Sequence, residues 1–525
     1  MNRRSFIEFL GKGMVAAPVL TSLLSSCTSG GEYLTEAITG ISSSARDEVV
    51  LADGLQYDLL VKWGDPITAS MNFGYNNDYI AFLKDSKRSG LLWVNHESVN
   101  PVLDPEYDTD KARLRKKIKQ EMEDVGGSIF RIKKSGGSWN IIQDDEANFK
   151  LTGSSEIPFE WHDRVAGAEK AMGTLANCSG GVTPWGTILT CEENYDTFYG
   201  DYNDLLGTYE ASPLQWELFF PRNKTEHYGW VVEYDPSSKT AKKHIGLGRF
   251  AHECATVKEL PDGRVVIYSG DDMNGGCLYK YVSDEAGKIY PGKLYVGDFS
   301  AGQWQAINYE RPELKTRFES ETQMLIKTRL AAKYVDGTPL DRPEDIEIDP
   351  IDGSVIIALT NNKPEENYFG SLMRLKETDG YDGLTFSYET YLTGGEETGF
   401  ACPDNLAFDP AGNLWFTSDI SGSELNLPPY DSFGNNGLFV VPRSGVNAGQ
   451  VIQMASAPND AEFTGPCFGP DGELFLSVQH PGETSKGIQY LTSNWPGGTG
   501  TIPKPGVIVI SGDRLEDFQV APDQV

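Results

Sequence analysis

The stretch NCSGGVTPWGTILTCEEN, residues 177–194, sets out a plan that recurs along the chain. A polar pair, Asn177 and Cys178, comes first, a Pro-x-Gly turn and an apolar run follow, and two carboxylates, Glu192 and Glu193, come last. Glycine tolerates the positive φ that a tight turn between two strands requires. The stretch therefore predicts a β-hairpin whose open end carries side chains suited to metal binding.

Five other segments repeat this plan around a turn glycine. They are AHECATVKELPDGRVVIYSGDD (251–272), RPEDIEIDPIDGSVIIALTNN (342–362), CPDNLAFDPAGNLWFTSD (402–419), FTGPCFGPDGELFLSVQH (463–480) and, more weakly, FGYNNDYIAFLKDSKRSGLLWVNHE (73–97). Six copies spaced by about 60 to 96 residues are typical of a six-bladed β-propeller with long insertions. We therefore expect an all-β fold over residues 49–525, a single propeller domain with inserted loops and short helices.

Equivalent positions on successive blades converge on the central channel of a propeller, so two rings of side chains are expected there. The ring before the turns is Cys178, Glu253, Glu344 and Asp404, and the ring after them is Glu97, Glu193, Asp271, Asn361, Asp419 and His480. Carboxylates gathered in a buried channel repel one another unless cations neutralise them. The pattern therefore predicts a metal site, although Glu253 and Glu344 could instead form structural ion pairs.

The charge of the chain limits its partners. The 525 residues carry a formal net charge of −31, whereas phosphate backbones are bound by clustered Lys and Arg, so we expect no nucleic-acid-binding surface. An acidic surface commonly serves solubility, and it also suits divalent cations, which prefer oxygen ligands. The lysine-bearing stretch Thr109–Asp124 is interpreted as a solvated insertion helix, with a basic binding surface as the alternative.

The N-terminus has the pattern of an export signal. Asn-Arg-Arg-Ser-Phe-Ile at residues 2–7 resembles a twin-arginine signal, and the apolar run that follows is too short to span a bilayer. Leu-Ser-Ser-Cys, ending at Cys27, resembles a lipoprotein processing site. We expect a signal peptide over 1–26, a flexible tether over 27–48, a lipid on Cys27 as the membrane attachment, and a location at a bacterial cell envelope after export in the folded state. The alternative is an ordinary secretory signal.

Seven cysteines contain no CxxC pair, so no zinc-ribbon signature is present. Each cysteine alone is best interpreted as a small buried hydrophobe. His96 and His252 flank expected ligands and are interpreted as core or supporting histidines.

Several of these segments together resemble the PhoX-type alkaline phosphatases. The resemblance is carried in order by WVNHE, NCSGG-TPWGT-LTCEEN, GRFAHECA, GDD, RPEDIEIDP, CPDNLAFDP-GNLW and TGPCFGPDG, over about residues 50 to 485. It implies a six-bladed propeller whose channel holds two iron and three calcium ions bridged by an oxo group. It also implies hydrolysis of phosphate monoesters.

The resemblance implies a role for each matching residue. Cys178 is expected as a thiolate ligand of iron (Fe3+), and a thiolate suits iron better than calcium. Glu193, Glu253, Asp272, Glu344 and Asp404 are expected as carboxylate ligands of iron or Ca2+, with Glu97 as a further metal ligand and Asn177 at the substrate. Arg342 is expected to bind the phosphate and act in catalysis, because its planar fork donates two hydrogen bonds and keeps its charge.

Three hypotheses follow. The first is a metal-dependent phosphomonoesterase that acts as a monomer on small phosphate esters. The second is a calcium-only lactonase or phosphotriesterase, which has no need of the Cys178 thiolate. The third is a noncatalytic ligand-binding propeller lipoprotein, which has no evident need of Arg342 beside metal ligands.

Overall fold

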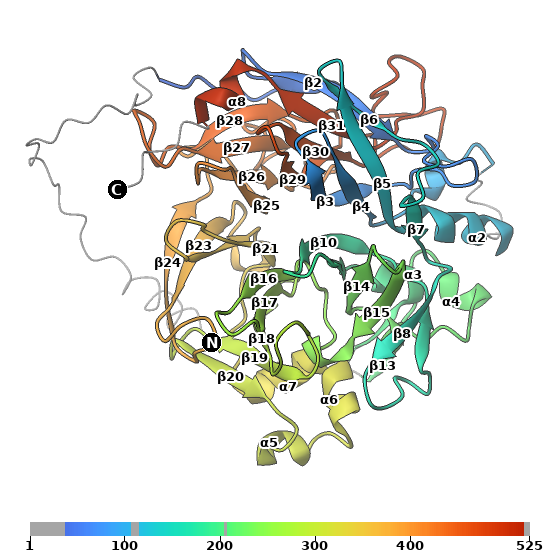
Figure 1. Ribbon diagram of the computed structural model, residues 1–525, viewed down its shortest axis with the longest axis vertical. Coiled ribbons are helices and arrows are strands. Elements are labelled where there is room, and N and C mark those ends of the chain that lie inside the picture. Colours follow the sequence, from blue (N-terminus) through green and yellow to red (C-terminus); the bar gives the residue numbers. More distant parts are fainter. Residues whose placement is uncertain (1–36, 107–114, 204–206, 519–525) are drawn as a thin grey trace, which may run out of the picture.

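Six sheets, antiparallel except for one parallel pair of strands, surround a central axis in the computed structural model, as Figure 1 shows. The structure describes residues 37–106, 115–203, 207–518. The innermost strands neighbour one another in a closed circle, β3–β10–β16–β21–β25–β29 and back to β3. The predicted six-bladed β-propeller is therefore confirmed.

Blades 1 to 3 follow one another along the chain, although two outer strands of blade 2 precede its innermost strand in the sequence. Blade 1 consists of β3 (Asn77–Ser86), β4 (Ser89–His96), β5 (Gly126–Ser135), β6 (Ser138–Ile141) and β7 (Phe149–Leu151). Blade 2 consists of β10 (Asn177–Val182), β11 (Ile188–Glu192), β14 (Val231–Asp235), β15 (Thr240–His244), β8 (Glu156–Glu160) and β9 (Lys170–Met172). Blade 3 consists of β16 (Thr256–Glu259), β17 (Val265–Gly270), β18 (Leu278–Ser283), β19 (Gly292–Asp298) and β20 (Gln303–Ile307).

The last two blades take their outermost strands from the N-terminal part of the chain. Blade 4 consists of β21 (Pro343–Ile348), β22 (Val355–Leu359), β23 (Ser371–Glu377) and β24 (Phe386–Thr393). Blade 5 consists of β25 (Pro403–Phe408), β26 (Leu414–Ser418), β27 (Gly437–Val441), β28 (Ile452–Ser456) and β1 (Val50–Leu51). Blade 6 consists of β29 (Glu462–Phe468), β30 (Leu474–Gln479), β31 (Gly506–Ser511) and β2 (Gln56–Lys62). This pairing of distant segments closes the circle.

A hydrophobic core lies between each pair of neighbouring blades. Both faces of an inner strand are covered by the neighbouring blades. All five residues of β22, Val-Ile-Ile-Ala-Leu, are accordingly apolar and buried. Trp93 packs between blades 1 and 2, and Trp415 packs between blades 5 and 6. Large aromatic side chains on the strands thus fill the spaces between blades.

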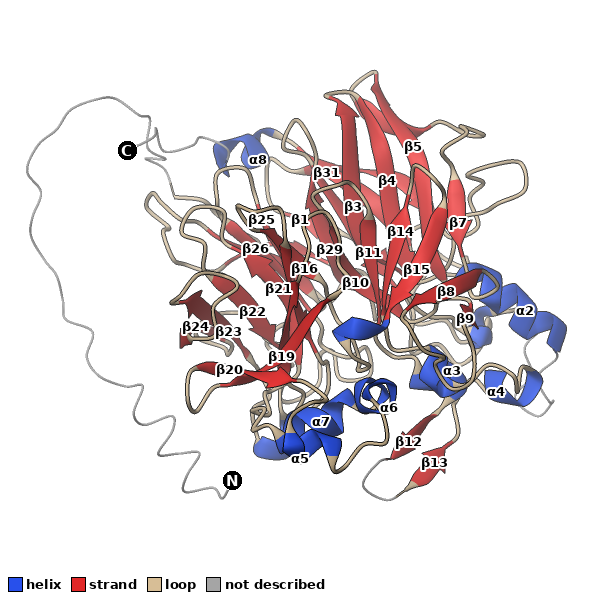
Figure 2. Ribbon diagram, turned by 60° about the horizontal axis from the view of Figure 1, so that its bottom comes forward, coloured by secondary structure: helices blue, strands red, loops and turns tan. Residues whose placement is uncertain are grey.

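The long insertions all lie at one end of the channel. In an antiparallel blade the innermost strand starts, and the second strand ends, at the same end, and all the helices but α8 fall in connections that begin or end there (Figure 2). These elements are η1 (Pro101–Leu103), α2 (Arg115–Asp124), α3 (Asp196–Tyr199), the hairpin β12 (Asp201–Asn203) and β13 (Thr208–Glu210), α4 (Trp216–Phe219), η2 (Thr225–His227), α5 (Pro312–Lys315), α6 (Glu321–Ile326), α7 (Thr328–Tyr334) and η4 (Lys363–Glu365). η3 (Ile245–Leu247), between β15 and β16, also lies at this end and contacts α6, whereas α8 (Asp513–Phe518) follows β31. We call the end with the insertions the mouth of the channel.

The first described residues, 37–48, pack against blade 5. Ile38 is buried, and the backbone N–H of Ile41 donates to the carbonyl of Gln453 at 2.8 Å. The tether expected over 27–48 therefore does not extend through 37–48, because an apolar side chain and a backbone hydrogen bond fix that part.

The expected signal peptide and Cys27 lie outside the described residues, as does the start of the insertion helix expected from Thr109. None of the helices in the described ranges is both long and apolar enough to cross a membrane.

Candidate metal centre

Each innermost strand is bent near its start, at the mouth of the channel. In five blades the pairing with the second strand slips by one residue, between Asn77 and Ile80, Asn177 and Gly180, Pro343 and Ile346, Pro403 and Leu406, and Thr464 and Cys467. In blade 3 an isolated bridge from His252 to Asp271 precedes the regular ladder, which leaves the same kind of irregularity. A bulge of this kind releases one residue from pairing and redirects its side chain.

The released residues form a ring around the channel. In blade order they are Asp78, Cys178, Glu253, Glu344, Asp404 and Gly465. Gly465 interrupts the acidic ring because its φ is +54° and a Cβ there would lie 2.7 Å from the carbonyl oxygen of Asp78. The structure therefore brings together the four residues predicted for the ring before the turns and adds Asp78.

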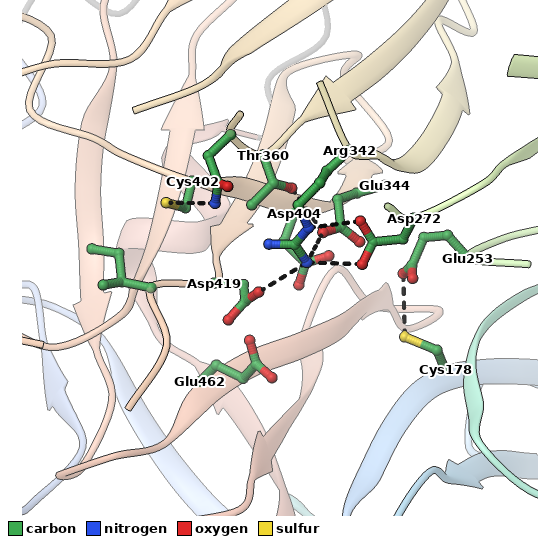
Figure 3. Close-up of polar contacts among 12 residues, drawn as sticks. Cys178, Glu253, Asp272, Arg342, Glu344, Thr360, Cys402, Asp404, Asp419 and Glu462 are labelled. Atoms are coloured by element: carbon green, nitrogen blue, oxygen red, sulfur yellow. Dashed lines mark hydrogen bonds and ion pairs between the residues drawn. The ribbon is translucent and has the colours of Figure 1, made fainter. Parts of the chain in front are cut away.

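Cys178 lies between two carboxylates of this ring, and Figure 3 shows its contact with one of them, Glu253. Its Sγ is 3.3 Å from Oδ2 of Asp78 and 3.3 Å from Oε1 of Glu253. Cys178, Glu193 and Glu253 each offer one ligand atom within 4.8 Å of the other two. Burial raises the pKa of the Cys178 thiol well above its ordinary value, and the charges of Asp78 and Glu253 raise it further.

A second set of ligand atoms shares Glu253. Glu253, Glu344 and Asp404 are buried, and one oxygen of each lies within 4.8 Å of the others. Burial raises the pKa of all three carboxyls well above the ordinary range, and repulsion from neighbouring carboxylates adds to this. Such a group is stable in the charged state only when cations neutralise it.

Arg342 extends from the residue before β21 into this acidic group. Its Nε and Nη2 donate to the two oxygens of Asp272, both at 2.8 Å, and Nη2 also donates to Oε1 of Glu344 at 2.8 Å (Figure 3). Burial opposes its charge, but Asp272 and Glu344 outweigh burial and raise the pKa of Arg342 well above its ordinary value. The guanidinium is therefore held as a fixed cation at the mouth.

The backbone of Arg342 is left-handed, with φ at +52°. This conformation costs a residue other than glycine about 1–2 kcal/mol. Asn76, Ala176 and Cys402 share it one residue before their own innermost strands. In four blades, therefore, a residue in the left-handed conformation directs the chain into the innermost strand at the channel.

Glu97 and Glu193 are joined by amide side chains at the mouth. Asn194 donates to Glu193 at 2.6 Å and to Glu97 at 3.3 Å, and Gln479 donates to the other oxygen of Glu97 at 2.7 Å. Asn76 donates to Glu97 at 3.1 Å. Both carboxylates are thus held beside the ring, where the sequence predicts them.

Several buried oxygens around the ring accept no hydrogen bond from any described residue. They are Oδ1 of Asp78, Oε2 of Glu253, Oε2 of Glu462 and the amide oxygens of Asn76 and Gln479. A buried polar atom without a partner costs about 1–3 kcal/mol, and more when charged. Unpaired atoms that are all oxygen acceptors, beside one thiol, match the ligands of hard cations and of iron. The residues present therefore fit a bound metal cluster.

Two predicted residues lie apart from this group. Asn177 is buried, and its amide donates to Thr174 and Thr190, both at 2.8 Å, so it braces the strand rather than facing the ring. Asp271 accepts a bidentate pair from Arg329, with Nη2 at 2.6 Å and Nε at 2.9 Å. We therefore leave both out of the proposed centre.

The flanking histidines have structural partners. His96 lies buried between the N–H of Gly74 and the hydroxyl of Ser128, and His252 contacts Ser269 and the carbonyl of Gly248. Burial lowers the pKa of His252 to about 3. Both are core histidines, as expected from the sequence.

Sequence reasoning missed Asp78 and Glu462. Asp78 lies farther from its turn glycine than its counterparts because the β3–β4 hairpin is longer. Glu462 starts β29 and binds Nε2 of His480 at 2.8 Å. Asp78 is identified when the blades are aligned on the bulge instead of on the turn glycine. The acidic residue of the pattern Asn-Asp-Tyr-Ile at 77–80 then falls at the released position.

The family of the chain follows from comparison with known proteins. A family model described as alkaline phosphatase PhoX matches residues 37–482. This chain belongs to the PhoX alkaline phosphatase family. It is accordingly a metal-dependent phosphatase with acidic clusters that can hold the metal.

The solved structure of Pseudomonas fluorescens PhoX in complex with vanadate, a transition-state analogue, is similar over nearly the whole fold. It shares 26% identity at a TM-score of 0.79, covering 91% of this chain and 98% of that one. A protein of unknown function from Dyadobacter fermentans shares 9% identity (TM-score 0.40, covering 88% of this chain and 100% of that one). A luciferin-regenerating enzyme shares 10% identity (TM-score 0.33, covering 87% and 96%). Comparison with curated proteins gave no match.

Proposed function

We propose that this PhoX-family phosphatase hydrolyses phosphate monoesters at the mouth of the propeller channel, using calcium and iron. The observation that carries the proposal is the ring itself, with a thiol and carboxylates on adjacent blades and buried oxygens that have no hydrogen-bond partner among the described residues. The vanadate that occupies the related Pseudomonas fluorescens enzyme supports phosphoryl transfer as the reaction.

The ligands are assigned by their chemistry. Cys178 would bind iron, because a thiolate is a soft ligand, and Glu193 and Glu253 would complete that side of the cluster. Glu344, Asp404, Asp272 and Glu97 supply the oxygens that calcium or iron takes. Bound cations supply positive charge that stabilises the phosphoryl group as it passes to water.

Arg342 has the properties of a phosphate-binding residue. Among the described residues its Nη1 has no hydrogen-bond partner, while Nε and Nη2 are fixed by Asp272 and Glu344. The side chain is 23% exposed, so a ligand can reach it. An arginine held in place in this way binds a phosphoryl oxygen without losing side-chain entropy in the reaction.

Location and assembly remain part of the proposal. The Arg pair at residues 3–4 and Cys27 support twin-arginine export and a lipid anchor at a bacterial cell envelope, with a monomer acting on small phosphate esters. Export in the folded state suits a protein that binds its metal before it crosses the membrane.

The proposal is tested with Glu253→Gln, because Glu253 belongs to both sets of ligand atoms. Glu259→Gln is the matched control, on an exposed position of the next strand. We expect Glu253→Gln to lose bound metal and at least a hundredfold in hydrolysis of p-nitrophenyl phosphate, with the fold retained. Equal metal content and turnover in both variants would contradict the assignment.

A further inference from the structure

A hollow of about 750 Å³ lies between α2 and residues 219–223, at the end of α4, away from the metal centre. Figure 1 shows the two helices side by side at the outer edge of the propeller. Volumes of about 300–1,000 Å³ are usual for sites that bind small molecules.

The two walls of the hollow are fixed to each other. Nε1 of Trp216, in α4, donates to Oε2 of Glu121, in α2, at 3.1 Å. Trp216 is fully buried in a hydrophobic cluster with Ile118 and Met122 of α2. The hollow is therefore preformed, so a ligand does not have to order its walls.

Positive charge is concentrated in this hollow, on a chain whose net charge is −31. Arg115, Lys119 and Arg222 line it together with one carboxylate, Glu123. Within the part of the chain that the structure describes, none of the three cations forms an ion pair. Lys117, on the same helix, differs because Asp104 and Glu106 neutralise it, both at 2.8 Å. Unneutralised cations in a concave site attract an anion.

The rest of the lining is apolar. Phe219, Phe220 and Met172 are all partly or fully exposed there, and the guanidinium of Arg115 lies 4.8 Å from the centre of the Phe220 ring. An inorganic anion gains nothing from such a surface, whereas a ligand with an apolar body gains about 25 cal/mol for each Å² it buries. The lining thus matches a molecule with an anionic head and an alkyl or aryl body.

We propose that this hollow binds a single anionic amphiphile, with its head between Arg115, Lys119 and Arg222 and its apolar body on Phe219 and Phe220. A bilayer surface is a poorer match because it is flat, whereas the cations and the aromatic rings line a concave space. The site is independent of the phosphatase reaction, since none of its lining residues belongs to the metal centre.

The test uses the fluorescent anion 1-anilinonaphthalene-8-sulfonate and competition by dodecanoate below its micelle concentration. We expect dodecanoate to displace the dye, while acetate, which has only the head, and dodecyl maltoside, which has no charge, do not at the same concentration. Displacement by the neutral detergent as effectively as by dodecanoate would overturn the proposal.

Substitution then locates the binding. We expect Lys119→Glu to weaken dodecanoate binding at least tenfold, whereas Lys116→Glu, on the same helix but outside the hollow, leaves it unchanged. Both variants change one exposed lysine, so the same unfolding midpoint and phosphatase activity are expected. Equal affinity in the two variants would overturn the proposal, as would binding to anionic phosphatidylglycerol vesicles without binding of monomeric dodecanoate.

Discussion

Replacement of Asp78 by asparagine should stabilise the metal-free protein at alkaline pH. Asp78 is buried, its Oδ2 accepts from Cys178 at 3.3 Å, and its Oδ1 has no partner among the described residues. Burial, with the charge of Glu97 added, raises the pKa of Asp78 to about 8. In the folded protein without metal, the Asp78 carboxyl must therefore either bind a proton or carry a charge that no cation neutralises.

The sign of the effect follows from the direction of this shift. A carboxyl whose pKa is higher in the folded state than in the unfolded state loses stability as pH rises from about 4 to about 8, and the loss is then constant. A rise in the pKa from about 4 to about 8, at about 1.4 kcal/mol for each pH unit between them, sets an upper limit of about 6 kcal/mol. Because water and neighbouring groups relax around the charge, we expect at least about 2 kcal/mol to be observed.

The assay is urea unfolding of chelated protein at pH 5 and pH 8.5. Asp78→Asn should be more stable than the wild type at pH 8.5, and the difference should be much smaller at pH 5. Asp163→Asn, which removes one exposed charge, is the control and should show no such difference. Added calcium should reverse the order, because the wild type gains more from the metal. An Asp78→Asn variant no more stable than the wild type at pH 8.5 would refute the reasoning.

Three further outcomes are expected. Lys243→Met should destabilise the fold by about 3–5 kcal/mol in urea unfolding, because it leaves the buried Glu192, 2.6 Å away, without a counter-charge. The double variant with Glu192→Gln should lose less stability than Lys243→Met alone, and an equal or larger loss would contradict this explanation. Gly465→Ala should lower the unfolding midpoint more than Gly136→Ala, since a Cβ at Gly136 meets no atom within 4 Å. Equal midpoints in the two variants would contradict the close approach of Gly465 to the carbonyl of Asp78. Arg342→Lys keeps the positive charge but loses the planar guanidinium, which can donate two hydrogen bonds to a phosphate. We therefore expect kcat/KM to fall by about a hundredfold or more while calcium binding is retained. An unchanged kcat/KM would exclude the phosphate-binding role.

Much of the fold could be predicted because each blade repeats one local pattern. A turn glycine between apolar runs specifies a hairpin, and six such hairpins require a closed arrangement that gives every sheet two covered faces. The insertions carry no such repeat. Helices such as α6 (Glu321–Ile326) are short and depend on tertiary contacts, so the sequence does not specify their place at the mouth.

The centre was predictable only where the sequence distance to the turn is nearly constant. Cys178, Glu253, Glu344 and Asp404 lie eight to ten residues before their turn glycines, whereas Asp78 lies twelve before Gly90. Hairpin length varies between blades, but the bulge is fixed by the approach of neighbouring strands at the channel. The bulge is a property of the assembled propeller, so the sequence distance to the turn does not locate it.

The same assembled geometry separates Asn177 from its neighbour Cys178. The two residues are adjacent in the chain, yet only Cys178 occupies the released position, while Asn177 pairs with Glu192 and its amide bonds two threonines. A one-residue difference in a strand reverses the direction of a side chain. Proximity in sequence to a ligand therefore did not predict which side chain reaches the channel.

Dependence of hydrolysis on metal in the channel is tested most directly by measuring both quantities on one preparation. Iron and calcium content by elemental analysis and hydrolysis of p-nitrophenyl phosphate would be followed in the purified protein, after chelation, and after return of both metals. We expect activity to disappear as the metal is removed and to return as it is restored. Undiminished hydrolysis by folded protein that retains neither iron nor calcium would contradict the proposed centre.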